Sequence, residues 1–477
     1  MQTKSFQQEQ DEALEYFLNT IYGVWKMGPD ERKIIQKEIP ESKQLFLELF
    51  LTQECNQNCG YCYLQKNGDK LYPVEYRDKE KMLKNMEILL DYYIENNINP
   101  IHIDFFSGEI WGYPIGNKAF DILLNACNRG LGIKSICIPS NFSFCRDKKL
   151  IEVVDYYIDA FAQKDITLMF SCSMDGEVLD KINRPTHAYD FKTDEYYTNI
   201  YDFCKRHKFG YHPMISSNGI EHQKENYDNW IKVHHKYYPN IEDFKAQYPI
   251  AMQLEVRDDT WTEDKILSYL DWLNHVIETD IKEFYDNNRD HFLSDLFWLD
   301  RYTNICKRSR CYLPYLIADV DPTPTCTAGK MLCIRCGDLA IAPCHRTSYE
   351  KFLFGRYIVE NDKIVGVKGQ NISLMNAWYR TGNMNKPKCD TCPMRKMCLR
   401  GCYGAQYEAN QDLLYPCESV CDFFKAKLTF LINKYEPTGV FDWPEMKERK
   451  ANLLHLINIF KESEDYEQWT ARIQHLI

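Results

Sequence analysis

The first 300 residues alternate between short apolar runs and apolar residues at helical spacing. A helix is predicted over residues 8–26, then a buried strand over 45–52 and a helical stripe from Met82 to Ile94. Further strands are predicted at 101–106, 133–139, 166–171, 211–216 and 250–256, with helices between them that include 117–129 and 147–162. About six βα units in series predict a parallel sheet or an open barrel, with functional groups at the carboxyl ends of the strands.

This alternation ends near residue 300, where cysteines begin to recur every few residues. The pattern therefore predicts four regions along the chain. They are an N-terminal helical segment (1–44), a partial barrel (45–300), a cysteine-rich domain (301–435) and a C-terminal helical tail (436–477).

Composition narrows the class of partner. The net charge of −11 argues against a nucleic-acid binder and favours a peptide or a small molecule. The first thirty residues contain no signal-peptide core, and no apolar run is long enough to cross a membrane, so a cytoplasmic protein is expected. In a reducing compartment, 20 cysteines point to metal or redox chemistry.

A three-cysteine loop follows the first predicted strand. The segment CNQNCGYC places Cys55, Cys59 and Cys62 on one short connection. Three thiolates can bind three irons of a [4Fe-4S] cluster and leave the fourth iron open to another ligand. The alternatives are buried structural cysteines or a zinc site whose fourth ligand lies elsewhere.

The loop resembles the CxxxCxxC signature of the radical S-adenosylmethionine (SAM) superfamily, and Tyr61 matches the aromatic residue that precedes its third cysteine. The resemblance implies an α/β fold with a partial (βα)6 TIM-like barrel. It also implies that SAM chelates the open iron, and that an electron from the cluster cleaves SAM to a 5′-deoxyadenosyl radical.

Two further segments fit this resemblance. Ser107, Gly108 and Glu109 follow the second predicted strand and resemble the GGE motif that holds the SAM ammonium group, although a turn is the alternative. Asn141 in PSNFSF stands where relatives carry the asparagine of a TNG turn.

The segment after the fourth predicted strand resembles the SLDG…R stretch of the family. Ser173, Asp175, Gly176 and Arg184 take its positions, which implies that Ser173 and Arg184 contact SAM. A strand-ending Asp-Gly turn followed by a surface arginine is the alternative.

The cysteine-rich region resembles the SPASM extension, which carries two auxiliary [4Fe-4S] clusters in radical SAM enzymes that modify peptides and proteins. Its thiols recur at short spacing without paired histidines, a pattern that favours iron-sulfur over most zinc modules. The resemblance assigns the first cluster to Cys326, Cys333, Cys344 and Cys402, and the second to Cys389, Cys392, Cys398 and Cys417. Cys336 competes with Cys333, and Cys421 with Cys417.

Two classes of SPASM enzyme are candidates for this chain. Sulfatase-maturing enzymes, which form formylglycine, carry an aspartate directly after the third ligand of the first auxiliary cluster, whereas this chain has His345 followed by Arg346. A histidine can also accept a proton, which makes His345 a candidate catalytic residue. Maturases of ribosomally made peptides, many of which form thioether or carbon-carbon crosslinks, are the other class.

The sequence therefore predicts a radical SAM enzyme that modifies a precursor peptide, with a reductant such as flavodoxin or ferredoxin as partner. A formylglycine-forming enzyme is one alternative, and a non-catalytic iron-sulfur protein for electron transfer or redox sensing is the other. Only 44 residues precede the first predicted strand, so recognition of a leader peptide is expected to be absent, supplied by a separate protein, or performed by the barrel insert and the helical tail.

Overall fold

The computed structural model describes residues 4–20, 43–111, 114–187, 189–237, 253–254, 260–276, 278, 331–380, 387–394, 402–442, 444, 447 and 451–477. The predicted ligands Cys326 and Cys398 lie outside the described residues, as does the end of the first predicted helix. The chain divides into two compact units. The first comprises Met1–Ile215, Glu225–Leu254 and Ala328–Thr381, and the second comprises Ser216–Lys224, Glu255–Thr327 and Gly382–Ile477.

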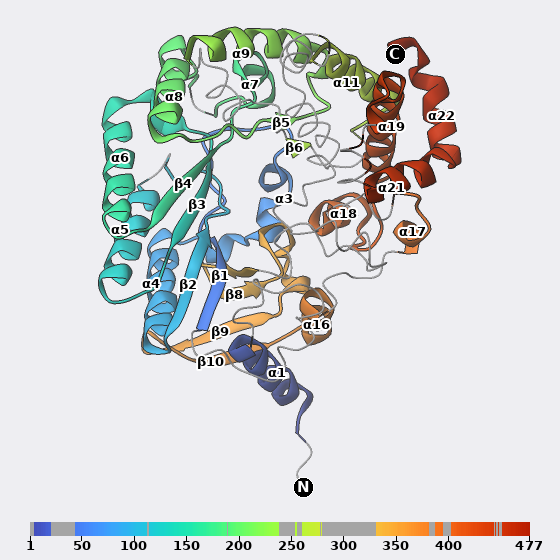
Figure 1. Cartoon of the computed structure of the whole chain (residues 1–477). Helices are drawn as coiled ribbons and strands as arrows, with labels where there is room; N and C mark the ends of the chain where they lie inside the picture. Colours follow the sequence, from blue (N-terminus) through green and yellow to red (C-terminus); the bar gives the residue numbers. More distant parts are fainter. Residues whose placement is uncertain are drawn as a thin grey trace. The chain divides into compact units, whose positions relative to one another are not determined.

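The first unit is built on an eight-stranded sheet in the order β10-β9-β8-β7-β1-β2-β3-β4 (Figure 1). Its strands are β1 (Lys43–Phe50), β2 (Ile98–Asp104), β3 (Ser135–Ser140), β4 (Thr167–Cys172), β7 (Met331–Arg335), β8 (Ala340–Ala342), β9 (Gly355–Glu360) and β10 (Lys363–Gly369). β1 to β4 run parallel, and β7 joins β1 in parallel before β8, β9 and β10 continue antiparallel.

Two more parallel strands, β5 (Met214–Ile215) and β6 (Gln253–Leu254), form a separate pair. A single parallel bridge between Cys172 and Tyr211 connects the end of β4 to the segment leading into β5. β5 is shorter than the strand predicted over 211–216, and of the strand predicted over 250–256 only residues 253–254 belong to the described part of the chain. All six predicted strands are nevertheless present in chain order, and the predicted α/β partial barrel is confirmed.

Helices cover the outer face of the parallel strands (Figure 1). The helices of this unit are α1 (Phe6–Thr20), α3 (Tyr63–Leu71), α4 (Lys79–Glu95), α5 (Ile115–Asn128), α6 (Lys148–Ala162), α7 (Glu177–Asn183), α8 (Asp194–His207), α9 (Gln223–Tyr237) and α16 (Ile372–Arg380). Asp78 and Asp147 cap α4 and α6 by accepting hydrogen bonds from backbone N–H groups of the first turn, as polar N-cap residues do.

The alternation of side chains along the strands decides which groups face the site. In β3, Ile136 and Ile138 are fully buried, while Ser135, Cys137 and Pro139 between them are half-buried. Neighbouring side chains on a strand point to opposite faces, so Ile136 and Ile138 share the more deeply buried face of β3.

The second unit is helical where it is described. Its helices are α11 (Glu263–Val276), α17 (Pro387–Asp390), α18 (Tyr403–Asn410), α19 (Glu418–Tyr435), α21 (Ala451–Lys461) and α22 (Glu464–Ile473). Phe423 of α19 is buried, and its ring centroid lies 4.7 Å from that of Trp261 and 4.5 Å from that of Tyr269. None of the helices described in either unit is long and apolar enough to cross a membrane.

Candidate functional site

The cysteine loop, residues 55–62, connects β1 to α3 and is clamped along its length by one neighbouring segment. Backbone N–H groups of Asn58 and Gly60 donate to the carbonyls of Pro185 and Asn183, at 2.7 and 2.9 Å. Gln57 and Thr186 form an antiparallel bridge. The Asn183–His187 segment therefore fixes the loop, and Cys62 ends it as the N-cap of α3.

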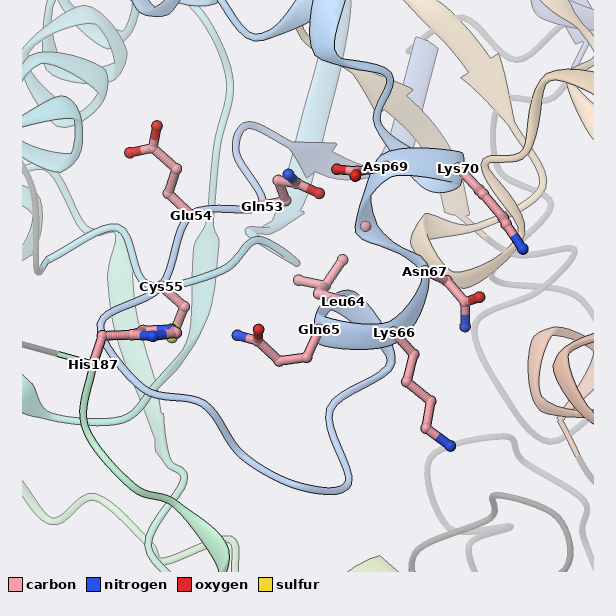
Figure 2. Close-up of a pocket in the computed structure, with 11 residues that line it drawn as sticks. Gln53, Glu54, Cys55, Leu64, Gln65, Lys66, Asn67, Asp69, Lys70 and His187 are labelled. Atoms are coloured by element: carbon pink, nitrogen blue, oxygen red, sulfur yellow. The ribbon is translucent and has the colours of Figure 1, made fainter.

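A cavity of about 430 Å³ opens beside this loop (Figure 2). Cys55 and His187 lie on one side of it, and Leu64, Gln65 and Lys66 of α3 lie on the other. The cavity gives the Cys55 side of the loop an opening, whereas Cys59 is buried.

The backbone of the Ser107–Glu109 segment is hydrogen-bonded to residues 52–54, which lead directly into the cysteine loop. The N–H groups of Gly108 and Glu109 donate to the carbonyls of Thr52 and Glu54, at 2.7 and 2.8 Å. A Cβ atom on Gly108 would lie 1.9 Å from the Glu54 carbonyl oxygen, so only glycine fits here. The hydroxyl of Ser107 accepts a hydrogen bond from the Leu51 N–H at 3.1 Å.

Glu109 is buried and joins the ends of β2 and β3. Its carboxylate accepts hydrogen bonds from the Asn141 N–H at 2.6 Å, the Trp111 N–H at 3.1 Å and the Ser140 hydroxyl at 3.1 Å. Burial raises the pKa of Glu109 from 4.5 to about 7, although these hydrogen bonds oppose the shift. A positively charged ligand group at this position would restore the ionised form.

Asn141 contacts the cysteine loop directly. Its Nδ2 lies 3.7 Å from Cys55 Sγ and donates to Asn56 Oδ1 at 2.8 Å. The next residue, Phe142, has φ 58°, in the left-handed region that a glycine enters without cost and a phenylalanine does not. Phe142 therefore adopts a conformation that favours glycine at the position that follows Asn141.

Ser173 and Arg184 follow β4. The backbone N–H of Ser173 donates to the Ser140 carbonyl at 2.8 Å, which places it beside the Glu109 set. Arg184 is only 4% exposed, so the alternative of a surface arginine is wrong. Its guanidinium donates to the hydroxyl of Tyr61 at 2.8 Å, inside the cysteine loop.

The residues present suit an iron-sulfur cluster in two respects. Cys55, Cys59 and Cys62 are free thiols on one clamped loop, close enough to influence one another electrostatically. Burial raises the pKa of Cys59 to about 12, so its thiolate would need a compensating cation such as iron. Among the described residues, no three His, Cys, Asp or Glu side chains are placed so that they could hold a single metal ion.

His345 lies against β1 and against Phe106, which follows β2. Its Nδ1 is 3.0 Å from Glu48 Oε1, and its ring stacks on Phe106 with a centroid distance of 4.2 Å. Glu48 is buried, and despite the burial the contact with His345 holds the pKa of its carboxyl below the ordinary value. His345 is thus held in a fixed orientation by a buried carboxylate.

The other predicted cysteine ligands fall in both units. Glu48 and Cys333 are partners in the β1–β7 register, and Cys344 acts electrostatically on Cys333. Cys336 instead donates its backbone N–H to the Phe50 carbonyl, and its own carbonyl accepts from Asn85. Cys336 also acts electrostatically on Cys333, so the choice between Cys333 and Cys336 stays a prediction. Cys389, Cys392, Cys402, Cys417 and Cys421 belong to the second unit, and their assignment to clusters stays a prediction.

Four residues near the cysteine loop are not singled out by the sequence pattern. Glu48 is a carboxylate within an apolar strand, and that contrast is a usable signal. Gln57, Asp180 and Lys192 give no such signal, because their contacts join segments far apart in the sequence.

No family model and no curated protein matches the chain. Solved structures do match it. The fold is that of radical SAM enzymes solved with bound SAM. One is the anaerobic sulfatase-maturating enzyme anSMEcpe with bound AdoMet, at 15% identity, 83% coverage of this chain, 100% of that chain and a TM-score of 0.52.

The same enzyme solved with AdoMet and the Cp18Cys peptide matches at 15% identity, covers 83% of this chain and 99% of that chain, and gives a TM-score of 0.50. SuiB of Streptococcus suis, bound to the precursor peptide SuiA, aligns at 13% identity over 82% of this chain and 80% of that chain, with a TM-score of 0.39. At these identities the similarity shows the fold.

Proposed function

We propose that this chain is a radical SAM enzyme of the SPASM type that modifies a ribosomally made peptide. The observation that carries the proposal is the docking of three motifs onto one loop. Gly108 and Asn141 contact the segment that holds Cys55, and Arg184 contacts Tyr61 between Cys59 and Cys62. An electron-transfer protein without SAM would not require this arrangement.

Cys55, Cys59 and Cys62 would hold the SAM-binding cluster. When bound, such a cluster supplies the electron that cleaves SAM to a 5′-deoxyadenosyl radical. Glu109 would accept the ammonium group of SAM, with Ser107 and Ser173 beside it at the strand ends. The buried hydrogen bonds from Ser140 and Asn141 keep the Glu109 carboxylate in place for that contact.

The substrate radical formed in the barrel must lose a proton and an electron before a new bond is complete. His345, oriented by Glu48, is the proposed proton acceptor. Auxiliary clusters on the cysteine-rich segments would take the electron, with Cys333 and Cys344 as ligands in the first unit. A flavodoxin or ferredoxin is the proposed external reductant.

The test is the formation of 5′-deoxyadenosine from SAM by the anaerobically reconstituted protein with dithionite. Changing Cys55, Cys59 and Cys62 together to alanine is expected to abolish the product. A matched control changes Cys127, which lies on α5 away from the loop, to alanine and is expected to leave product formation intact. Undiminished product from the triple variant would contradict the proposal.

Formylglycine formation is the second candidate, favoured by the pairing of His345 with Glu48 at the position after Cys344. Mass spectrometry of a modified cysteine-containing peptide separates the two reactions. Formylglycine formation removes the thiol sulfur, whereas a thioether crosslink retains it. Loss of the thiol sulfur from the product would show that the chain forms formylglycine and not a thioether crosslink.

A further inference from the structure

Two side chains of the cysteine loop other than its cysteines, Gln57 and Tyr61, both contact one guanidinium. Arg184 Nε donates to Gln57 Oε1 at 3.2 Å, and Arg184 Nη1 donates to the Tyr61 hydroxyl at 2.8 Å. Gln57 Oε1 also lies 3.8 Å from Cys59 Sγ. Arg184 is therefore connected to the predicted ligand Cys59 through a single intervening side chain.

The positive charge of Arg184 belongs to a closed group of four buried charges. Arg184 lies 3.6 Å from Asp175 and 3.2 Å from Asp180, and Lys192 lies 2.9 Å from Asp180. All four side chains are at most 6% exposed. Two cations and two carboxylates cancel, so removal of one member leaves a net charge that the low-dielectric interior does not screen well.

The two cations have different positions relative to the cysteine loop. Lys192 donates to the backbone carbonyls of Asp180 and Arg184, at 2.9 and 2.6 Å, and the structure gives it no contact with a side chain of the loop. Arg184 faces the loop directly.

We infer that Arg184 is a positioning residue that sets the reduction potential of the cluster on Cys55, Cys59 and Cys62, with Asp175 as its counter-charge. This inference rests on the proposed function and assigns Arg184 to the cysteine loop in addition to any contact with SAM. A positive charge beside the cluster stabilises the reduced form, which carries one more negative charge. Loss of the Arg184 charge alone, with the two carboxylates still in place, should therefore make the potential more negative.

The test is a redox titration monitored by electron paramagnetic resonance on the anaerobically reconstituted full chain. The signal followed is the one that changes when SAM is added. Arg184→Gln is expected to shift its midpoint potential to a more negative value. Arg184→Lys keeps the positive charge, so its midpoint potential is expected to stay close to the wild-type value. Lysine cannot donate to both Gln57 and Tyr61 as the guanidinium does.

Two further variants test the direction and the origin of the shift in midpoint potential. Asp175→Asn removes the counter-charge and is expected to shift the potential in the opposite direction, to a less negative value. Lys192→Gln removes a cation from the same group but away from the loop, and a smaller shift than that of Arg184→Gln is expected. If Arg184→Gln fails to load the cluster, the direction of the potential shift in Asp175→Asn still tests the inference, and Arg184→Lys still shows whether the charge alone keeps the wild-type potential.

An unchanged potential in Arg184→Gln, equal shifts in Arg184→Gln and Lys192→Gln, or a shift of Asp175→Asn toward more negative values overturns the inference. A wild-type protein without any SAM-responsive signal overturns the proposed function together with it. Failure of the proposed function is distinguishable from failure of this inference, because the wild-type protein alone reveals the former and only the variants reveal the latter.

Discussion

Among the described residues of the first unit, Arg335 and Arg184 are both almost completely buried, but their surroundings differ. Arg335 at the end of β7 is fully buried, and its guanidinium pairs with Asp338 at 2.7 Å and with Glu350. It also donates to the backbone carbonyls of Leu71 and Ser348, at 2.9 and 3.0 Å. These contacts hold the turn after β7 against the end of α3.

Arg184 has the same kind of carboxylate partners, yet it also contacts the side chains of Gln57 and Tyr61 in the cysteine loop. Burial and ion pairing alone therefore do not mark a functional arginine, since both residues have them. What distinguishes Arg184 is that its remaining donors go to side chains located between predicted metal ligands.

The largest expected effect tests Arg335. Arg335→Gln removes the buried ion pairs with Asp338 and Glu350, which keep only their pairs with Arg356, and it removes the guanidinium donor to the Ser348 carbonyl. This loss should lower the free energy of unfolding by about 3 kcal/mol. Urea unfolding measures this loss. The potential of the SAM-responsive cluster should stay at its wild-type value, and a shift as large as that of Arg184→Gln would remove the distinction between the two arginines.

A somewhat smaller effect is expected at Gly108, which seats the second motif on the same loop. Gly108→Ala forces a backbone shift at Glu54 and should cost about 2 kcal/mol of stability and weaken SAM binding. Gly60→Ala is the matched control within the cysteine loop, because a Cβ atom there meets nothing within 4 Å. Equal stability and SAM affinity of the two variants would show that the close contact at Gly108 has no role.

The smallest effect concerns Glu109. Its pKa is raised from 4.5 to about 7, so the folded protein binds this proton more tightly than the unfolded chain does. The resulting stabilisation is complete below the lower value and is lost as the pH rises to the higher one. Between pH 6 and pH 8, wild type should lose on the order of 1 kcal/mol more than Glu109→Gln in urea unfolding. Parallel pH profiles would contradict this.

The parallel strands and their order were predictable because their apolar runs are separated by amphipathic helices. β1 to β4 fall close to the predicted ranges, and the polar residues expected at their ends, such as Glu109 and Asn141, are brought together there. β7 to β10 were not predicted, since β8 has only three residues and the cysteines dominate the sequence pattern in this region.

The partners of Arg184 could not be read from the sequence for a different reason. Asp180 and Lys192 lie on either side of it in the chain, and an aspartate four residues before an arginine is common on exposed helices. Only the clamping of the Asn183–His187 segment against the cysteine loop turns these charges inward. The contact of Arg184 with Tyr61 depends on that packing.

The central claim is that Cys55, Cys59 and Cys62 hold a cluster to which SAM binds directly. The most direct measurement is the electron paramagnetic resonance spectrum of the dithionite-reduced protein with and without SAM, in wild type and in the triple alanine variant. The account predicts a spectrum that changes on SAM addition in wild type and a SAM-insensitive spectrum in the variant. An identical SAM-induced change in both proteins would contradict it.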